Sequence, residues 1–192
     1  MNGTLSDACG VVVATLLGIP LVLLPGYALG RLTGILGFRA LAAGDRLLCG
    51  ALLGIGLLPA LDSLVIQAAG VPAAALANGA LGLAALLPAL RSLRTSLNRA
   101  VLTLAALWLG VVAYALIDID TGTALYQPVT VIDLVKHAAL TRAIVAHGLP
   151  PVDPFFARPD RAGYYYEFYT LTALVDGVGG RLVDGRTAFA GL

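Results

Sequence analysis

The residues best suited to chemistry gather in one stretch of an otherwise apolar chain. Residues 133–167 hold both histidines, the only lysine and three of the seven tyrosines. On a helix, Asp133 and His137 would share one face, with Lys136 beside them. A carboxylate there can act as a general base, and the cations can stabilise negative charge developing on a phosphate. An ordinary Asp–His or Asp–Lys pair on a solvated helix face has the same spacing, so this pattern alone leaves both interpretations open.

Two further motifs follow in the same stretch. Asp153 lies within the segment 150–154, PPVDP, whose prolines restrict the backbone. It is either a second acid of the same site or a simple turn residue. The tyrosine run 164–166 suits a membrane interface, and its phenol groups could also line a sugar or headgroup pocket. Glu167 comes directly after the run and is either a site residue or a charge at the start of a helix.

Composition indicates that the rest of the chain sits in lipid. Hydrophobic residues make up 59% of the 192 residues and charged residues only 12%, against about 25% charged residues in a typical soluble domain. The net charge of +1 gives no general attraction to nucleic acid. Cys9 and Cys49 lie far apart in apolar surroundings, and no spacing suggests a metal site or a disulfide framework. No Lys or Arg precedes Arg31, so we expect the first apolar segment to stay in the membrane as a helix and not to be cleaved as a signal.

Apolar segments of about 20 residues predict membrane-spanning helices. The fold expected from them is an all-α, polytopic transmembrane bundle of about five spans, with an outward-facing loop that contains an amphipathic surface helix. The predicted spans are Val11–Gly30, Leu47–Ala69, Ala73–Leu90, Ala100–Ile117 and a weaker Tyr164–Leu182, and a tight turn at residues 70–72 joins the second to the third.

This pattern divides the chain into three regions. Residues 1–117 form a four-helix transmembrane region, residues 118–163 a polar loop, and residues 164–192 the fifth span with a truncated end. Within the loop, Pro128 can open a helix, and Gly148 with the prolines after it stops one, which predicts a surface helix over 129–147.

The basic residues predict the orientation. The loops 31–46 and 91–99 hold three arginines each and should face the cytoplasm, which puts the N-terminus and the 118–163 loop outside. Asp62 lies inside the second predicted span, where a carboxyl group is a functional candidate. The alternative is that Asp62 sits near the outer interface or is hydrogen-bonded to a neighbouring helix.

Taken together, these motifs resemble a known family. The run Asp133-x-x-Lys136-His137, then Leu149-Pro150-Pro151-x-Asp153-Pro154, then Tyr164-Tyr165-Tyr166 entering a helix, resembles the YYY family of polytopic membrane proteins, named for the triple tyrosine. It is also similar to the first outer loop of GT-C membrane glycosyltransferases, which move sugar from a polyprenyl-phosphate donor. The resemblance covers about residues 118–175. The acidic loop follows the fourth predicted span here, whereas most GT-C enzymes place it after the first.

The resemblance implies roles for individual residues. Asp133 and Asp153 would be the catalytic acids, with Asp133 as the base or as the carboxylate that holds a cation, so a divalent cation is the candidate cofactor. His137 and the tyrosines Tyr164, Tyr165 and Tyr166 match the pattern as residues that would bind substrate. Apart from the resemblance, the charged residues Lys136, Arg142 and Glu167 are further candidates for substrate binding. Glu167 departs from the YYY pattern, which usually has an aromatic or small residue at that position.

The function expected from these observations is that of part of a GT-C-like glycosyltransferase acting at the outer membrane face. Its partners would be membrane lipid and a lipid-linked sugar. Because GT-C enzymes carry further helices, we expect this chain alone to be an inactive fragment. The alternative is a non-catalytic membrane scaffold or a carrier of lipid or polymer. A secondary transporter is a third hypothesis. It needs ionisable residues at membrane depth, and Asp62 and Asp176 are the only candidates in the sequence.

Overall fold

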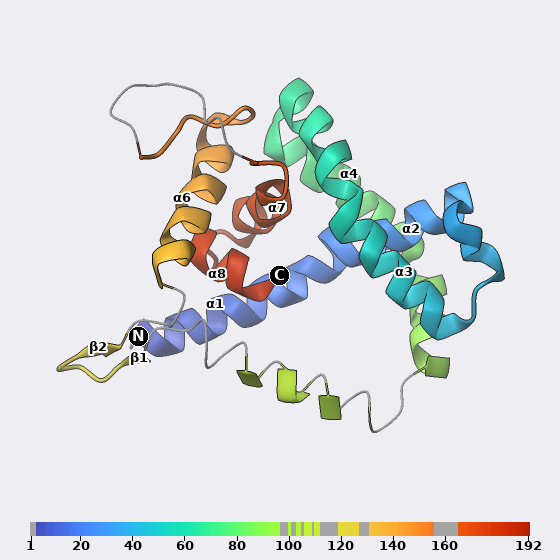
Figure 1. Ribbon diagram of the computed structural model, residues 1–192, viewed down its shortest axis with the longest axis horizontal. Coiled ribbons are helices and arrows are strands. Elements are labelled where there is room, and N and C mark those ends of the chain that lie inside the picture. The colour runs from blue at the N-terminus through green and yellow to red at the C-terminus, as the bar shows by residue number, and fades with distance from the viewer. Residues whose placement is uncertain are drawn as a thin grey trace.

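The computed structural model describes residues 3–96, 100, 103–104, 106–108, 110–111, 119–126, 131–155 and 165–192. Within these residues the regular elements are helices apart from one short hairpin, in which β1 (Ile119–Asp120) pairs antiparallel with β2 (Leu125–Tyr126). The all-α prediction is therefore confirmed for the described part of the chain. The helices (Figure 1) are α1 (Gly3–Gly18), α2 (Leu24–Thr33), α3 (Ala43–Gly56), α4 (Leu58–Ser96), α6 (Val131–His147), α7 (Tyr169–Gly179) and α8 (Gly185–Gly191).

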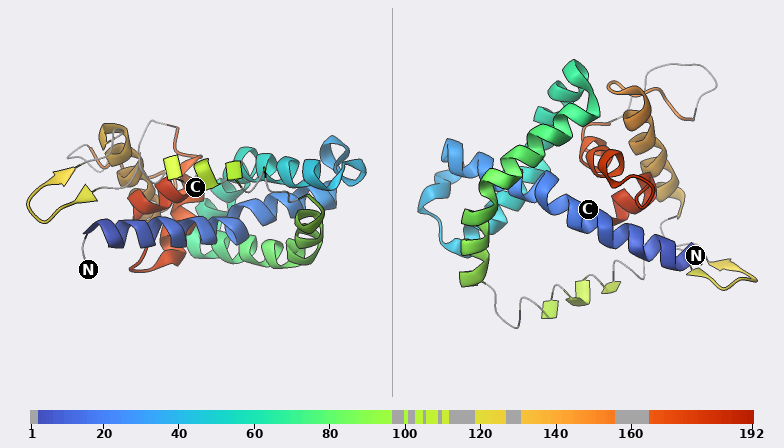
Figure 2. Two further views of the ribbon diagram at one scale, coloured as in Figure 1. Left: turned by 90° about the horizontal axis from the view of Figure 1, so that it is seen from below. Right: turned by 180° about the vertical axis from the view of Figure 1, so that it is seen from behind.

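The first apolar segment forms one long rod. A π-helical stretch, Ile19–Leu23, joins α1 to α2 without interrupting the rod, as both views of Figure 2 show. Pro20 lies at the start of this stretch and has no N–H to donate, so the helix widens there and does not end. Pro25 lies in the first turn of α2, where a missing N–H costs little. The 3-10 turn Ile35–Ala40 then leads towards α3.

Helix α4 is a hairpin of two helices. Gly70 has φ 84° and ψ 170°, a conformation that residues with a Cβ rarely adopt, and the chain reverses there. The reversal explains how the Asn78 amide nitrogen reaches both carboxylate oxygens of Asp62 at 3.1 Å, although a straight helix would separate these residues by about 24 Å. The turn predicted at residues 70–72 is thus present. Asp62 is buried and hydrogen-bonded across the hairpin, which agrees with its structural interpretation.

Among the described residues, two helices are long and apolar enough to cross a membrane, namely Leu5–Thr33 and Leu58–Ser96. The prediction of about five spans is not confirmed. The fourth predicted span falls mostly outside the described residues, and the fifth contains α7, which is 11 residues long. Eleven residues rise about 16 Å, roughly half of a 30 Å hydrocarbon core. The segment 164–182 therefore differs from the single spanning helix expected there.

Helices α2, α3 and α4 pack through glycines. A Cβ at Gly26 would collide with the backbone of Gly50 and Gly54, which form a Gly-x-x-x-Gly pair on α3. A Cβ at Gly82 on α4 would collide in the same way with the carbonyl of Pro20. Small residues let helix backbones approach closely in lipid, where van der Waals contact replaces the hydrophobic effect as the driving force.

The C-terminal helices pack against the N-terminal ones. Helix α7 contributes Leu171, Leu174 and Val175 to a core that also contains Ala14 of α1 and Ile66 of α4. Helix α8 lies along α1, so the end of the chain sits beside its first helix (Figures 1 and 2). The regions 1–117 and 164–192, which the sequence separated, share this core.

We predict that Gly26→Ala lowers the thermal stability of the detergent-solubilised protein, because overpacking a tight contact costs about 1–3 kcal/mol. The matched control is Gly79→Ala, since a Cβ at Gly79 meets nothing within 4 Å. Alanine favours a helix over glycine by about 1 kcal/mol, so the control should be at least as stable as the parent. The measurement is the midpoint of helix loss by circular dichroism. Equal midpoints for the two variants would contradict the glycine contact.

Candidate functional site

Helix α6 carries the centre of the predicted site, and one of its faces is buried against α7. Helix α6 ends at His147, before Gly148 and the prolines that follow it, as expected. Residues 129 and 130 lie outside the described part. Thr141 and Ile144 on the packed face are fully buried, whereas Val135 is exposed. The apolar side of α6 therefore packs on protein. The sequence had placed it on the membrane surface.

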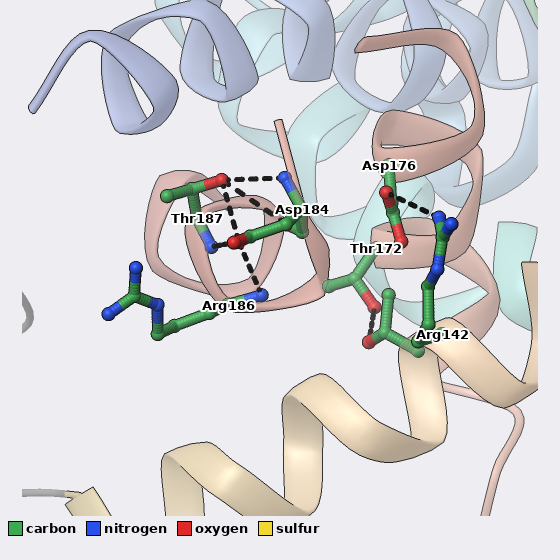
Figure 3. A network of polar contacts seen from close by, with 7 residues as sticks. Arg142, Thr172, Asp176, Asp184, Arg186 and Thr187 are labelled. Carbon is green, nitrogen blue, oxygen red and sulfur yellow. Dashed lines mark hydrogen bonds and ion pairs between the residues drawn. The ribbon is translucent and has the colours of Figure 1, made fainter. Parts of the chain in front are cut away.

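A ladder of polar contacts joins α6 to α7. His137 Nδ1 lies 2.6 Å from the Tyr169 hydroxyl, and the hydroxyls of Thr141 and Thr172 lie 2.7 Å apart. Figure 3 shows the next contact, a 3.5 Å ion pair between the Arg142 guanidinium and the Asp176 carboxylate. The partners advance in the same direction along both helices. The ladder fixes how α6 is rotated against α7, and so fixes which α6 residues face outward.

His137 is the member of the ladder nearest to Asp133 along α6. Its ring stacks on Phe189 of α8, with centroids 4.3 Å apart and 13° between the planes. Burial lowers the pKa of His137, the nearby Lys136 ammonium lowers it further, and the Asp133 carboxylate opposes both. The imidazole is consequently neutral at pH 7 and offers one nitrogen as a donor and the other as an acceptor.

Asp176 closes the ladder in a buried position. One carboxylate oxygen contacts Arg142, and the other is buried without a hydrogen-bond partner. Burial raises the pKa of Asp176 above its ordinary value, and the Arg142 charge offsets part of that effect. The Arg142 side chain is 68% exposed, so solvent screens the ion pair and it contributes little stability. Arg142, expected to bind substrate, is thus engaged with α7.

The structure keeps Asp133, Lys136 and His137 together but separates Asp153 from them. Asp133 is exposed in the first turn of α6. Asp153 lies six residues beyond the last residue of α6, where its carboxylate accepts a hydrogen bond of 2.9 Å from the Phe155 N–H. From Asp133 to the end of α6 at His147 the helix rises about 21 Å. Asp133 and Asp153 therefore lie at opposite ends of α6, and Asp153 has the contact of a turn residue.

The tyrosine run contributes less to the site than its sequence indicated. Tyr164 lies outside the described residues, Tyr165 is 80% exposed, and Tyr166 packs against the core. The Glu167 side chain is exposed, and its carbonyl accepts hydrogen bonds from the backbone N–H and the hydroxyl of Thr170 at the start of α7. These contacts fit a residue that begins a helix.

Sequence reasoning missed three residues that complete the ladder, namely Tyr169, Thr172 and Phe189. Asp176 was considered only as a transporter residue. A signal for the first two was present, because Tyr169, Thr172 and Asp176 are spaced by three and four residues within an apolar segment and so share one helix face. Phe189 lies 52 residues beyond His137, and no periodicity links the two.

Neither a metal-binding group among the described residues nor a match to a known protein identifies the chemistry of this site. Within the described residues, no group of three or more His, Cys, Asp or Glu side chains is arranged to hold a metal ion. No family model, no curated protein and no solved structure matches the chain.

We predict that the stability of the protein falls as the pH drops from 7 to 5.5, in part because of His137. A histidine whose pKa is lowered by folding binds a proton more readily in the unfolded chain, so its protonation favours unfolding. The folded state is therefore destabilised as the pH falls below the ordinary value of 6.5. In His137→Asn, whose amide can still meet the Tyr169 hydroxyl, the slope of the thermal midpoint against pH should be smaller. His147→Gln, which changes the other histidine, is the control, and a parental slope in His137→Asn would count against this origin.

Proposed function

We propose that the chain is part of a membrane glycosyltransferase that moves a sugar from a polyprenyl-phosphate donor at the outer membrane face. The observation that carries this proposal is the exposed carboxylate of Asp133 at one end of α6, beside Lys136 and His137. The charges of Asp133 and Lys136 both act on the His137 imidazole, so the three groups lie within electrostatic range of one another. The ladder behind them supports the proposal, because packed and hydrogen-bonded residues hold a site more firmly than a free loop does.

In the proposed reaction, an acceptor hydroxyl attacks the anomeric carbon of the donor. The bond between that carbon and the phosphate oxygen breaks as the new glycosidic bond forms. Asp133 takes the proton of the hydroxyl, and Lys136 stabilises the negative charge on the leaving polyprenyl phosphate. His137, neutral and partly buried, orients the donor or acceptor by hydrogen bonding. Asp153 is assigned to the turn after α6 and takes no part in proton transfer.

The proposed topology places the two candidate spans in the bilayer, with α4 reversing at Gly70. Helix α3 continues into the first half of α4 with only Leu57 between them, so residues 43–69 form one further crossing. The crossings are then 5–33, 43–69 and 71–96, followed by the fourth predicted span at 100–117. Helices α6, α7 and α8 form an outer unit that rests on α1 and α4.

A non-catalytic scaffold or carrier of lipid or polymer is the second candidate. The separation of Asp133 from Asp153 favours it, because the two acids expected to work together do not meet. In that case the carboxylates would be dispensable, whereas the exposed Tyr165 and the tyrosines near it would be needed for binding.

The enzyme proposal is tested by sugar transfer from radiolabelled polyprenyl-phosphate sugars, using the protein expressed from its natural reading frame. We predict that Asp133→Asn lowers the rate by about 100-fold or more, as loss of a general base does. Asp45→Asn, which changes an exposed carboxylate on α3, is the control and should leave transfer unchanged.

Asp153 distinguishes the turn role from a catalytic role. Asparagine can accept the same hydrogen bond from the Phe155 N–H, so Asp153→Asn should retain transfer and Asp153→Ala should lose part of it. Full activity in Asp133→Asn would remove the enzyme proposal and leave the carrier. Loss of activity in Asp153→Asn would return Asp153 to the chemistry.

The proposed orientation is tested by cysteine labelling in whole cells, with Cys9 and Cys49 replaced by alanine. Thr123→Cys, in the exposed turn between β1 and β2, should react with a membrane-impermeant maleimide from outside. Ser96→Cys, at the end of α4, should react only after the cells are opened. Labelling of Ser96→Cys in intact cells would reverse the orientation.

A further inference from the structure

Four arginines gather where α2 ends, α3 begins and α4 ends. Arg31, Arg39 and Arg46 line a cavity of about 460 Å³, and Arg31 and Arg46 also line an adjoining cavity of about 270 Å³ together with Arg91. They come from separate elements of the fold, which the glycine contacts between α2 and α3 bring together. From the sequence, loops 31–46 and 91–99 predict only the orientation of the chain. In the structure, arginines of both loops line adjoining cavities.

The structure shows no acidic partner for these cations among the residues it describes. Within the residues that the structure describes, none of the four arginines makes an ion pair with a carboxylate, and the two ion pairs present are Arg142–Asp176 and Arg186–Asp7. Arg39 instead donates to the carbonyls of Arg31 and Leu32, at 2.9 and 2.6 Å, and so is fixed on the end of α2. The cavity therefore holds an excess of positive charge.

Arg46 has a donor that the protein does not satisfy. Its Nε is buried without a hydrogen-bond partner, although buried polar groups are nearly always paired. The Arg46 side chain lines both cavities. An acceptor placed there, such as a phosphate oxygen, would satisfy the donor and match the planar guanidinium groups around it.

An apolar groove begins beside this charged cavity. It has a volume of about 290 Å³ and lies between α2, α3 and α4, further along these helices from the ends that carry the arginines. Tyr27 borders both the groove and the two charged cavities, with its hydroxyl 3.0 Å from the Ser92 hydroxyl. Leucines from each helix line the groove, among them Leu24, Leu47 and Leu90.

We propose that the arginine cavity binds the phosphate of an anionic glycerophospholipid and that the adjoining groove takes one of its acyl chains. A free phosphate would account for the arginines but would leave the groove without a role. Basic pockets between membrane helices bind anionic headgroups in other proteins for the same electrostatic reason. This site lies at the opposite end of α2 from the rod's junction with α1 and is independent of the proposed sugar transfer, since it uses none of the residues of α6.

The test is binding of lipids to the full chain in a neutral detergent, measured by native mass spectrometry. Phosphatidylglycerol should be retained and phosphatidylcholine, whose headgroup carries no net charge, should be lost at lower activation energy. Inorganic phosphate and glycerol 3-phosphate serve as probes without acyl chains and should bind at least about tenfold more weakly, because they leave the groove empty. Equal retention of the two phospholipids would overturn the proposal, and tight binding of inorganic phosphate would reduce the site to one for a free anion.

Variants locate the binding. Arg46→Gln should weaken phosphatidylglycerol binding by about tenfold or more, and Arg46→Lys should not restore it, because lysine keeps the charge but has no Nε–H in that position. Arg31→Gln, which changes an exposed side chain, gives the same test without risk to the packing around Arg46. Arg181→Gln, an exposed arginine after α7, is the control. Parental binding in both Arg31→Gln and Arg46→Gln would overturn the proposal.

Discussion

Close approach of helix backbones is the constraint on which the rest of this structure depends. Gly26 of α2 meets Gly50 and Gly54 of α3 with no room for a Cβ between them, and Gly82 of α4 meets the carbonyl of Pro20 in the same way. In lipid, apolar side chains gain little by leaving their surroundings, so helices associate where their shapes fit most closely. These contacts bring the end of α2, the start of α3 and the end of α4 to one place. The arginine cavity exists only because of that convergence.

The unit formed by α6, α7 and α8 follows a different physical rule. Helices α6 and α7 bury hydroxyls, an imidazole and a carboxylate between them, and buried polar groups must find partners. The contacts of His137 with Tyr169 and of Thr141 with Thr172 meet that requirement and also determine which side of α6 faces outward. Asp133 remains exposed as a result. The reactivity proposed for it depends on a structural ladder to which it does not itself belong.

Charge is divided between two ends of the fold. Arginines with no carboxylate partner among the described residues lie at the end of α2, the start of α3 and the end of α4. Asp133 and the polar ladder belong to the unit built from α6 and α7. This division agrees with the two proposals, in which an anionic lipid binds at one end of the fold and a lipid-linked substrate at the other. Each role rests on its own residues, so each can be removed without the other.

The sequence by itself determined the apolar character of the chain, the helical fold, the turn at Gly70 and the end of α6 at His147. These features depend on composition, on periodicity and on glycine and proline, which act over a few residues. It also placed Asp133, Lys136 and His137 together, because residues three and four apart on a helix are neighbours whatever surrounds them. Only the tertiary structure decided that Asp153 lies at the far end of α6, that Tyr169 and Phe189 meet His137, and that Arg31, Arg46 and Arg91 line one cavity. Such contacts join residues tens of positions apart, and they follow from how whole helices pack, which no local pattern records.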